Sequence, residues 1–288
     1  SKITPRVGGI SIAVGITLAI VVRKMSAQIS STEILLLISA APTFLIGLAE
    51  DLTKKISVRK RLFFTILSSV LFIYLLNSRI VKLDLPYIDM LFSIPLLSIL
   101  FTIFAITGLS NAYNIIDGFN GLSSMVGIIT LLAITYVSFI VADPLLMYLS
   151  LIMAAAILGF FIWNYPRGLI FLGDGGAYLI GFWIASLSVM LTYRHQEISP
   201  WFALLINGYP IVETLFTIYR RKIHQSKSPG LPDPALLFSL DLPSPYFPRP
   251  ALDARDHPPL RMDARADAID RTRVYRHAKG PADGREGL

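Results

Sequence analysis

The feature that most constrains the fold of this chain is a succession of long apolar runs. Most of these runs are free of charged residues over a length close to the roughly 20 residues that a helix needs to cross the hydrocarbon core of a bilayer. The runs lie at residues 7–22, 33–49, 61–77, 91–110, 121–142, 144–163, 175–193 and 199–219. We therefore predict an all-α, polytopic integral membrane helix bundle with about eight transmembrane helices.

Composition supports this class, because 54% of the 288 residues are hydrophobic and only 16% are charged, against about 25% in soluble proteins. The net charge of +7 could indicate a nucleic-acid partner, but basic residues of membrane proteins concentrate in cytoplasmic loops. We expect the lipid bilayer as a partner and no nucleic acid. The absence of cysteine excludes a disulfide framework, a thiolate metal site and a cysteine nucleophile from this sequence.

Eight crossings would divide the connecting segments between two sides of the membrane. Up to Lys227, twelve Lys and Arg residues then fall on one side and five on the other, and the positive-inside bias makes the richer side cytoplasmic. The richer side holds 1–6, 50–61, 111–121, 164–174 and the chain after Arg220, whereas the other side holds 23–32, 78–90, 143 and 194–198. The acidic motifs in the connecting segments, described below, fall on the predicted cytoplasmic side.

A polar island, Asn111–Gly121, interrupts two apolar runs on that side. Its polar side chains recur at every third residue and would form one stripe on a helix, which the glycines then end. The stripe consists of Asn111, Asn114, Asp117 and Asn120. Carboxamides and a carboxylate at a helix end suit a nucleotide or a metal-bound diphosphate. The alternative is a polar loop with turn glycines.

Two further acidic motifs lie on the same side. Glu50 and Asp51 end the second apolar run and open a basic loop, where local ion pairing with Lys54 and Lys55 is the simpler explanation. Asp174 lies among glycines in the segment 171–176, which would let a ligand approach the backbone closely. Turn chemistry alone also places Asp in such a segment.

Glu213 lies inside the last apolar run, about two helical turns before Arg220. An ionisable group at membrane depth has either a basic partner on another helix or a direct function. The histidines do not share a ligand spacing, which argues against a histidine metal site.

Four motifs occur in the order and spacing of one enzyme family. They are Arg6-Val7-Gly8-Gly9-Ile10, Gly47-Leu48-Ala49-Glu50-Asp51, the polar island continued to Leu122, and Phe171-Leu172-Gly173-Asp174-Gly175-Gly176. Over about residues 3–233 the chain resembles the polyprenyl-phosphate N-acetylhexosamine-1-phosphate transferases, bacterial enzymes of the glycosyltransferase family 4 type. Glu50 and Asn120 depart from this pattern, because many members have Asp at both positions.

The resemblance implies transfer of a sugar 1-phosphate from a UDP-N-acetyl sugar to undecaprenyl phosphate, with release of UMP. This reaction would start a lipid-linked cell-envelope polysaccharide, such as O-antigen, at the cytoplasmic face of the bacterial inner membrane. The implied cofactor is Mg²⁺, with Mn²⁺ as the alternative, because two anionic phosphates must approach each other.

The resemblance and the acidic pattern together give a set of candidate site residues. Asp51 is the candidate for orienting or deprotonating the lipid phosphate, and Asp174 resembles the metal-binding aspartate of the family. The full set is catalytic Glu50, Asp51 and Asp117, substrate-binding Asn111, Asn114, Asn120, Glu213 and Arg220, and metal-binding Asp51 and Asp174.

The last part of the chain differs in composition from the rest. Residues 229–288 contain 10 of the 18 prolines and no apolar run long enough to cross a membrane, so we expect disorder. We predict a transferase domain at 1–227 and an atypical tail at 228–288. The histidine motif that follows residue 233 in the family is missing, which suggests a frameshifted reading, with a natural basic tail as the alternative. The start at Ser1 suggests a fragment that lacks the family's first span.

Two other functions are compatible with the sequence. A transporter or flippase for a lipid-linked or anionic solute would account for Glu213 and the polar island without catalysis, although transporter sites tend to lie near the membrane midplane. A truncated, inactive transferase would account for the tail.

Overall fold

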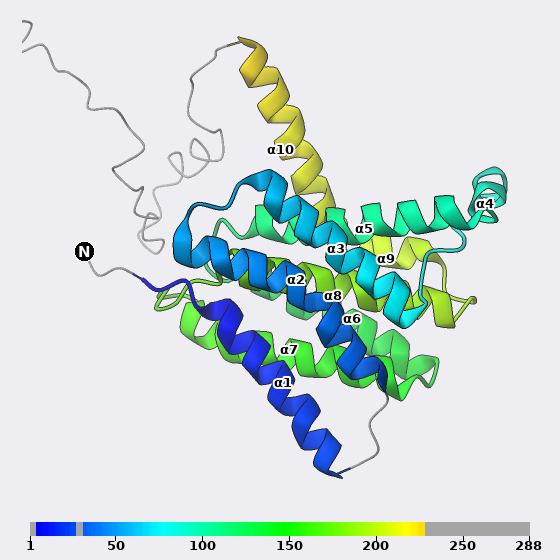
Figure 1. Ribbon diagram of the computed structural model, residues 1–288, viewed down its shortest axis with the longest axis horizontal. Helices are drawn as coiled ribbons and strands as arrows, with labels where there is room; N and C mark the ends of the chain where they lie inside the picture. Colours follow the sequence, from blue (N-terminus) through cyan, green and yellow to red (C-terminus); the bar gives the residue numbers. More distant parts are fainter. Residues whose placement is uncertain (1–3, 27–30, 228–288) are drawn as a thin grey trace, which may run out of the picture. The chain divides into compact units, whose positions relative to one another are not determined.

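A computed structural model describes residues 4–26 and 31–227, and every regular element in these ranges is an α-helix (Figure 1). The helices are α1 (Gly8–Ser26), α2 (Ser31–Thr53), α3 (Val58–Leu76), α4 (Pro86–Phe92), α5 (Pro95–Ile116), α6 (Leu122–Ile140), α7 (Pro144–Asn164), α8 (Gly173–Arg194), α9 (Pro200–Ile206) and α10 (Gly208–Lys227). The predicted all-α architecture is therefore confirmed over these residues. The predicted tail, 228–288, lies outside the described residues.

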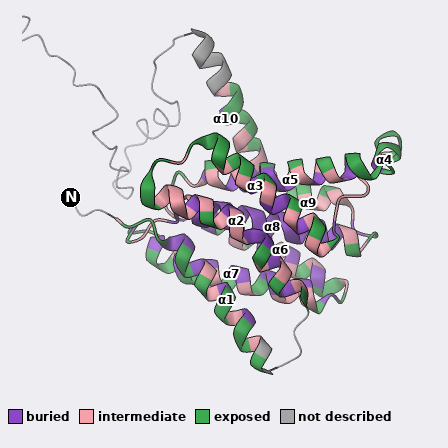
Figure 2. Ribbon diagram, in the orientation of Figure 1, coloured by how far each residue is buried: buried purple, intermediate pink, exposed green. Residues whose placement is uncertain are grey.

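Helix α8 forms the centre of the bundle, where it packs against α1, α2, α5, α6 and α7 (Figure 2). Its apolar window is completely buried, whereas the corresponding windows of α2, α5, α6 and α7 are 39% buried. A helix that is apolar on all sides belongs in the interior, and one that is buried on one side presents its other side to lipid. The start of α8 is therefore held from several directions by its neighbours.

The structure supports fewer membrane spans than the eight predicted. Among the described residues, five helices are long and apolar enough to cross a membrane, namely α2, α5, α6, α7 and α8. Helices α9 and α10 give a sixth candidate that bends by 68°. The apolar part of α1 is confined to Gly8–Arg23, and the first turn of α3 contains Arg59, Lys60 and Arg61. Charged residues are costly in hydrocarbon, so α3 falls short by composition, and for α1 only the shorter apolar stretch Gly8–Arg23 is described.

Connecting segments meet at two opposite ends of the bundle, as the alternation of membrane crossings predicted. At one end, the segment 5–9 bonds to residues 171–172, and Gly121 donates to the side chain of Asn164. We call this the acidic end, formed by residues 4–7, 50–58, 117–121 and 165–172. These contacts bring together parts of the predicted groups 1–6, 111–121 and 164–174, and the assignment of the acidic end to the cytoplasm stays a prediction.

At the opposite end, Asp143 joins the start of α7 to the end of α8. Its carboxylate accepts the backbone N–H of Leu146 at 3.1 Å and lies 2.8 Å from Arg194 Nε and 3.0 Å from His195 Nε2. Burial raises the pKa of Asp143, but the hydrogen bonds from His195 and Leu146 and the charge of Arg194 outweigh it and leave the pKa below its usual value. The carboxylate therefore stays ionised in its cap position.

An ion pair also joins α1 to α2 at the opposite end. Arg23 Nη1 lies 3.0 Å from Glu33 Oε1, and the Glu33 side chain is fully buried whereas that of Arg23 is 30% exposed. The Arg23 guanidinium carbon is 3.9 Å from the centroid of the Tyr148 ring on α7. The arginine thus connects three helices, and the buried carboxylate depends on it for its charge partner.

We expect Arg23→Met to destabilise the protein by about 3–5 kcal/mol, because it leaves a buried carboxylate without its cation. The double variant Arg23→Met/Glu33→Gln should recover most of this loss. Glu33→Gln alone should cost less than Arg23→Met, since Arg23 keeps contact with solvent. Thermal denaturation of the four purified proteins measures the coupling. Losses that simply add in the double variant would contradict the proposed pairing.

Candidate active site

Asp51 connects the end of α2 to the start of α8. Its Oδ1 accepts the backbone N–H of Asp174 at 3.0 Å, and its Oδ2 accepts that of Gly175 at 2.9 Å. The first N–H groups of a helix have no partner within the helix, so the carboxylate caps α8 from another part of the chain. The Asp51 side chain is 2% exposed, and Lys54 Nζ lies 3.6 Å from it.

Glycines allow α1 and α2 to approach the first turn of α8 closely. A Cβ at Gly47 would lie 2.6 Å from the Cα of Gly175, and one at Gly9 would lie 2.4 Å from the backbone N of Gly176. Gly173 has φ +76°, and a Cβ there would lie 2.5 Å from the Asp51 carboxylate. The sequence suggested that the glycines around Asp174 admit a ligand, whereas in the structure Gly175 and Gly176 allow the backbones of α2 and α1 to approach α8.

Asp174 lies in the first turn of α8 and forms an ion pair with Arg61, which lies in the first turn of α3. The two side chains are 21% and 18% exposed, respectively. An arginine that faces a largely buried carboxylate supplies the positive charge that the carboxylate needs. Sequence reasoning counted Arg61 only among the basic loop residues, because nothing in the sequence links positions 113 residues apart.

Asp117 follows the last residue of α5 and faces the other two aspartates. Burial raises the pKa of Asp117 well above the usual value for aspartate, and the negative charges of Asp174 and Asp51 raise it further. The positive charge of Arg6 acts in the opposite direction. The residue as a whole is partly exposed. Three carboxylates from three separate helix ends are thus close enough to influence one another's charge.

The asparagines of the polar island have different surroundings. Asn111 donates to the carbonyl of Thr107 at 2.8 Å, and its Oδ1 accepts the Tyr178 hydroxyl at 3.4 Å. Asn114 is partly exposed and makes no side-chain hydrogen bond to the part of the chain that the structure describes. Asn120 packs against Gly168, where a Cβ would lie 2.7 Å from its Nδ2. The amides of Asn114 and Asn120 therefore make no hydrogen bond to the described residues, whereas the amide of Asn111 is engaged at both ends.

Asn164 organises this end of the bundle and was missed by the sequence reasoning. Its Oδ1 accepts the N–H of Gly121 at 2.6 Å, and its Nδ2 donates to the carbonyl of Ile170 at 2.8 Å. The side chain therefore holds the polar island against the segment that leads into α8. Its only mark in the sequence is a polar residue at the end of an apolar run.

The remaining predicted residues, Glu50, Glu213 and Arg220, have partners other than the three aspartates. Glu50 accepts the N–H of Ile56 at 2.7 Å and closes the loop after α2. Glu213 and Arg220 pair with each other at 3.4 Å on α10, which packs against α5 and α9 and extends away from the other helices (Figure 1). The sequence left two alternatives for Glu213, a basic partner on another helix or a direct function, and in the structure its partner is Arg220 on its own helix.

The arrangement fits a divalent ion that is bound together with a phosphate ligand. Within residues 4–26 and 31–227, three or more acidic or histidine side chains do not converge into a ready-made metal site. Mg²⁺, however, is commonly held by one or two carboxylates, with phosphate oxygens and water completing its shell. Asp174 and Asp117 could provide such ligands, whereas both oxygens of Asp51 already accept N–H groups.

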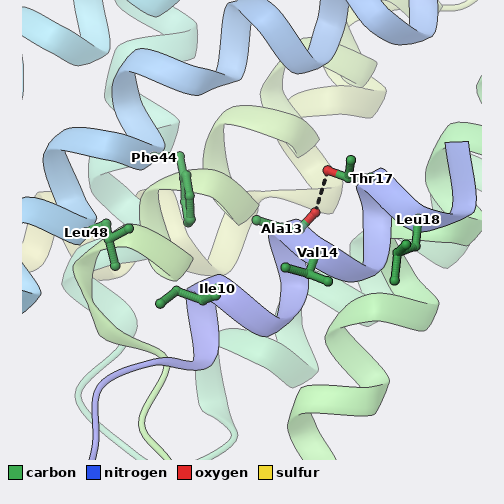
Figure 3. A pocket seen from close by; sticks show the side chains of 7 residues that line it. All are labelled: Ile10, Ala13, Val14, Thr17, Leu18, Phe44 and Leu48. Atoms are coloured by element: carbon green, nitrogen blue, oxygen red, sulfur yellow. Dashed lines mark hydrogen bonds between the residues drawn. The ribbon is translucent and has the colours of Figure 1, made fainter. Parts of the chain in front are cut away.

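An apolar pocket of 330 Å³ lies between α1 and α2 (Figure 3). Its single hydroxyl, on Thr17, donates to the carbonyl of Ala13 at 2.8 Å. The pocket ends at Leu48, three residues before Asp51. The lining residues are Ile10, Ala13, Val14, Thr17, Leu18, Phe44 and Leu48. This lining fits an aliphatic chain and offers nothing to a nucleotide.

The fold and the site define a class of protein, a polytopic membrane helix bundle with a carboxylate cluster at one end. The chain belongs to glycosyl transferase family 4, whose sequence profile matches residues 33–192. The matched region includes Asp51, Asp117 and Asp174 and excludes Glu213 and Arg220.

Individual relatives extend the similarity. The chain is 28% identical over 228 residues to the probable undecaprenyl-phosphate N-acetylglucosaminyl 1-phosphate transferase of Bacillus subtilis (78% of this chain, 62% of the relative). It is 30% identical over 226 residues to the phospho-N-acetylmuramoyl-pentapeptide-transferase of Staphylococcus epidermidis (74% and 68%). The enzyme of the same name in Streptococcus sanguinis is 28% identical over 221 residues (73% and 65%). The chain thus spans about two thirds of the length of these relatives.

Proposed function

We propose that this protein transfers an N-acetylhexosamine 1-phosphate from a UDP-sugar to undecaprenyl phosphate and releases UMP. The observation that carries the proposal is that Asp51, Asp117 and Asp174, from three helix ends, lie close enough at the acidic end to influence one another's charge. Family membership and the activities named for the relatives support it. The shared chemistry of those relatives favours an N-acetyl sugar.

In this reaction an oxygen of the lipid phosphate attacks the β-phosphorus of the UDP-sugar, and the bond from that phosphorus to the bridging oxygen breaks. UMP leaves with the bridging oxygen, and the lipid gains a diphosphate-linked sugar. Bound Mg²⁺ would neutralise the phosphates and the charge that develops on the leaving group. Asp174 and Asp117 are the proposed metal-facing carboxylates, and Asn111, Asn114 and Asn120 the proposed nucleotide-facing amides.

Asp51 is proposed to act mainly by holding the first turn of α8, and with it Asp174, in place. This differs in emphasis from the expected contact with the lipid phosphate, because the carboxylate is 2% exposed and its oxygens accept two backbone N–H groups. Asp117 is proposed to act at the reacting phosphates, since it lacks the two backbone N–H contacts that occupy the oxygens of Asp51.

The proposed setting is the cytoplasmic face of a bacterial inner membrane, where the product would begin a lipid-linked cell-envelope polysaccharide such as O-antigen. The excess of basic residues on the acidic end supports this orientation. Residues 1–227 are proposed as the transferase domain.

One observation favours a transporter as the second candidate. Helices α9 and α10 bend by 68° relative to each other, and broken helices form the binding sites of many transporters. The three interacting aspartates, however, lie at the ends of α2, α5 and α8 and not at this break. The position of the acids therefore favours the transferase.

We expect membranes that contain this chain to release UMP from UDP-N-acetylglucosamine or UDP-N-acetylmuramoyl-pentapeptide only when undecaprenyl phosphate and Mg²⁺ are present. Chelation with EDTA should abolish release, and Mg²⁺ or Mn²⁺ should restore it, because the paired phosphates cannot approach each other without a cation. Membranes without the chain provide the background. UMP release at the same rate without undecaprenyl phosphate and Mg²⁺ would contradict the proposed reaction. No UMP release, combined with uptake of a lipid-linked sugar, would favour the transporter.

A further inference from the structure

The segment before α1 is fixed to the segment that leads into α8. The N–H of Phe171 donates to the carbonyl of Pro5, and the N–H of Gly8 donates to the carbonyl of Phe171, both at 3.0 Å. Arg6 lies between these two anchors, and Phe171 comes three residues before Asp174. The backbone of Arg6 is therefore held at a defined place near Asp174, whereas the Arg6 residue as a whole is exposed to solvent.

Three cations act on the three aspartates, and two of them are in ion pairs. Lys54 lies 3.6 Å from Asp51, and Arg61 pairs with Asp174. The third cation, Arg6, influences the charge of Asp117 but has no ion pair with any acid in residues 4–26 and 31–227. Its guanidinium is therefore near enough to act on Asp117, and its donors are not in an ion pair with the described acids.

We propose that Arg6 binds a phosphate group of the substrates at the acidic end, an inference that rests on the proposed transferase function. Guanidinium presents a planar fork of N–H donors that matches two phosphate oxygens, and it stays charged at any physiological pH. The backbone on both sides of Arg6 is bonded to Phe171, three residues before Asp174, so an arginine here can offset the repulsion between the carboxylates and a phosphate. The phosphate belongs either to the UDP-sugar or to undecaprenyl phosphate, and these two sources are separable by experiment.

The test measures binding of each source separately with purified full-length protein. UDP is titrated calorimetrically with Mg²⁺ and again with EDTA, and undecaprenyl phosphate is titrated by native mass spectrometry. Arg6→Gln should lower the affinity for one of these two ligands by about 10-fold or more. This is the size expected for the loss of a hydrogen bond to a charged group. Arg6→Lys should recover part of the loss, because it restores the charge without the fork.

Arg59→Gln is the matched control, since Arg59 is also an exposed arginine without an ion pair among the described acids. It should leave both affinities unchanged. A loss confined to UDP assigns Arg6 to the donor phosphates, and a loss confined to undecaprenyl phosphate assigns it to the acceptor. Unchanged affinities for both ligands in Arg6→Gln, with normal binding by the wild type, would overturn the role of Arg6 alone. Failure of the wild type to bind either ligand would overturn the transferase function and this inference with it.

Discussion

Asp174→Asn is expected to reduce Mg²⁺-dependent UMP release by about 100-fold or more, because metal stabilisation of phosphoryl transfer is worth several kcal/mol. The amide has the same size as the carboxylate but lacks the charge that holds a divalent ion. The variant should also need a higher Mg²⁺ concentration for any remaining activity. UMP release measured across a Mg²⁺ titration gives both quantities.

Two controls separate the metal role of Asp174 from its structural role. Asp84→Asn removes an exposed carboxylate that pairs with Lys82 at the opposite end, and it should leave UMP release unchanged. The double variant Arg61→Gln/Asp174→Asn removes both halves of the ion pair, so it should regain any lost thermal stability and remain inactive. Full activity in either variant that carries Asp174→Asn would rule out Asp174 as a metal-facing carboxylate.

Gly47→Ala is expected to lower both thermal stability and UMP release, although the added methyl group lies away from any substrate. Its Cβ would lie 2.6 Å from the Cα of Gly175 and 2.7 Å from the N of Gly175, so α2 and α8 must move apart. Overpacking of this kind costs about 1–3 kcal/mol. Because Asp51 caps α8 from the same stretch of α2, the movement should also displace Asp174.

The control for this variant is Gly108→Ala on α5, where a Cβ would meet nothing within 4 Å. Alanine is favoured over glycine within a helix, so this change should keep or slightly raise the melting temperature. Melting curves and UMP release should be compared for both variants in the same detergent. A Gly47→Ala protein with wild-type stability and activity would contradict the close packing of α2 on α8.

Much of the site could be predicted because its residues follow local rules. The apolar runs identify the helices, and charge-free length is read directly from the chain. The polar island predicted that a helix continues through Asn114 and ends near Gly118, and α5 does end at Ile116. The alternation of crossings predicted which loops share an end, since every crossing reverses the direction of the chain, and the count of basic residues predicted which end is cytoplasmic.

Other features depend on contacts between distant segments. The Arg61–Asp174 pair and the two hydrogen bonds of Asn164 join positions that no local pattern connects. Glu213 was expected to contact the substrates, but in the structure it pairs with Arg220. Helical spacing brings the two residues to the same side of α10, and the sequence could not show that no residue of another helix would pair with Glu213 instead. The bend between α9 and α10 was also missed, because the run 199–219 reads as one apolar span.

The sequence by itself determined the class of this protein, an all-helical membrane bundle, and the end at which its acidic motifs gather. Both follow from the length of the apolar runs and from the distribution of charge, which do not require knowledge of packing. Only the tertiary structure decided that α8 is the central helix and that Asp51 caps its first turn. A helix is buried on all sides only when its neighbours pack around it. A cap between residues 123 positions apart forms only when packing brings an acceptor to the unpaired N–H groups of the helix.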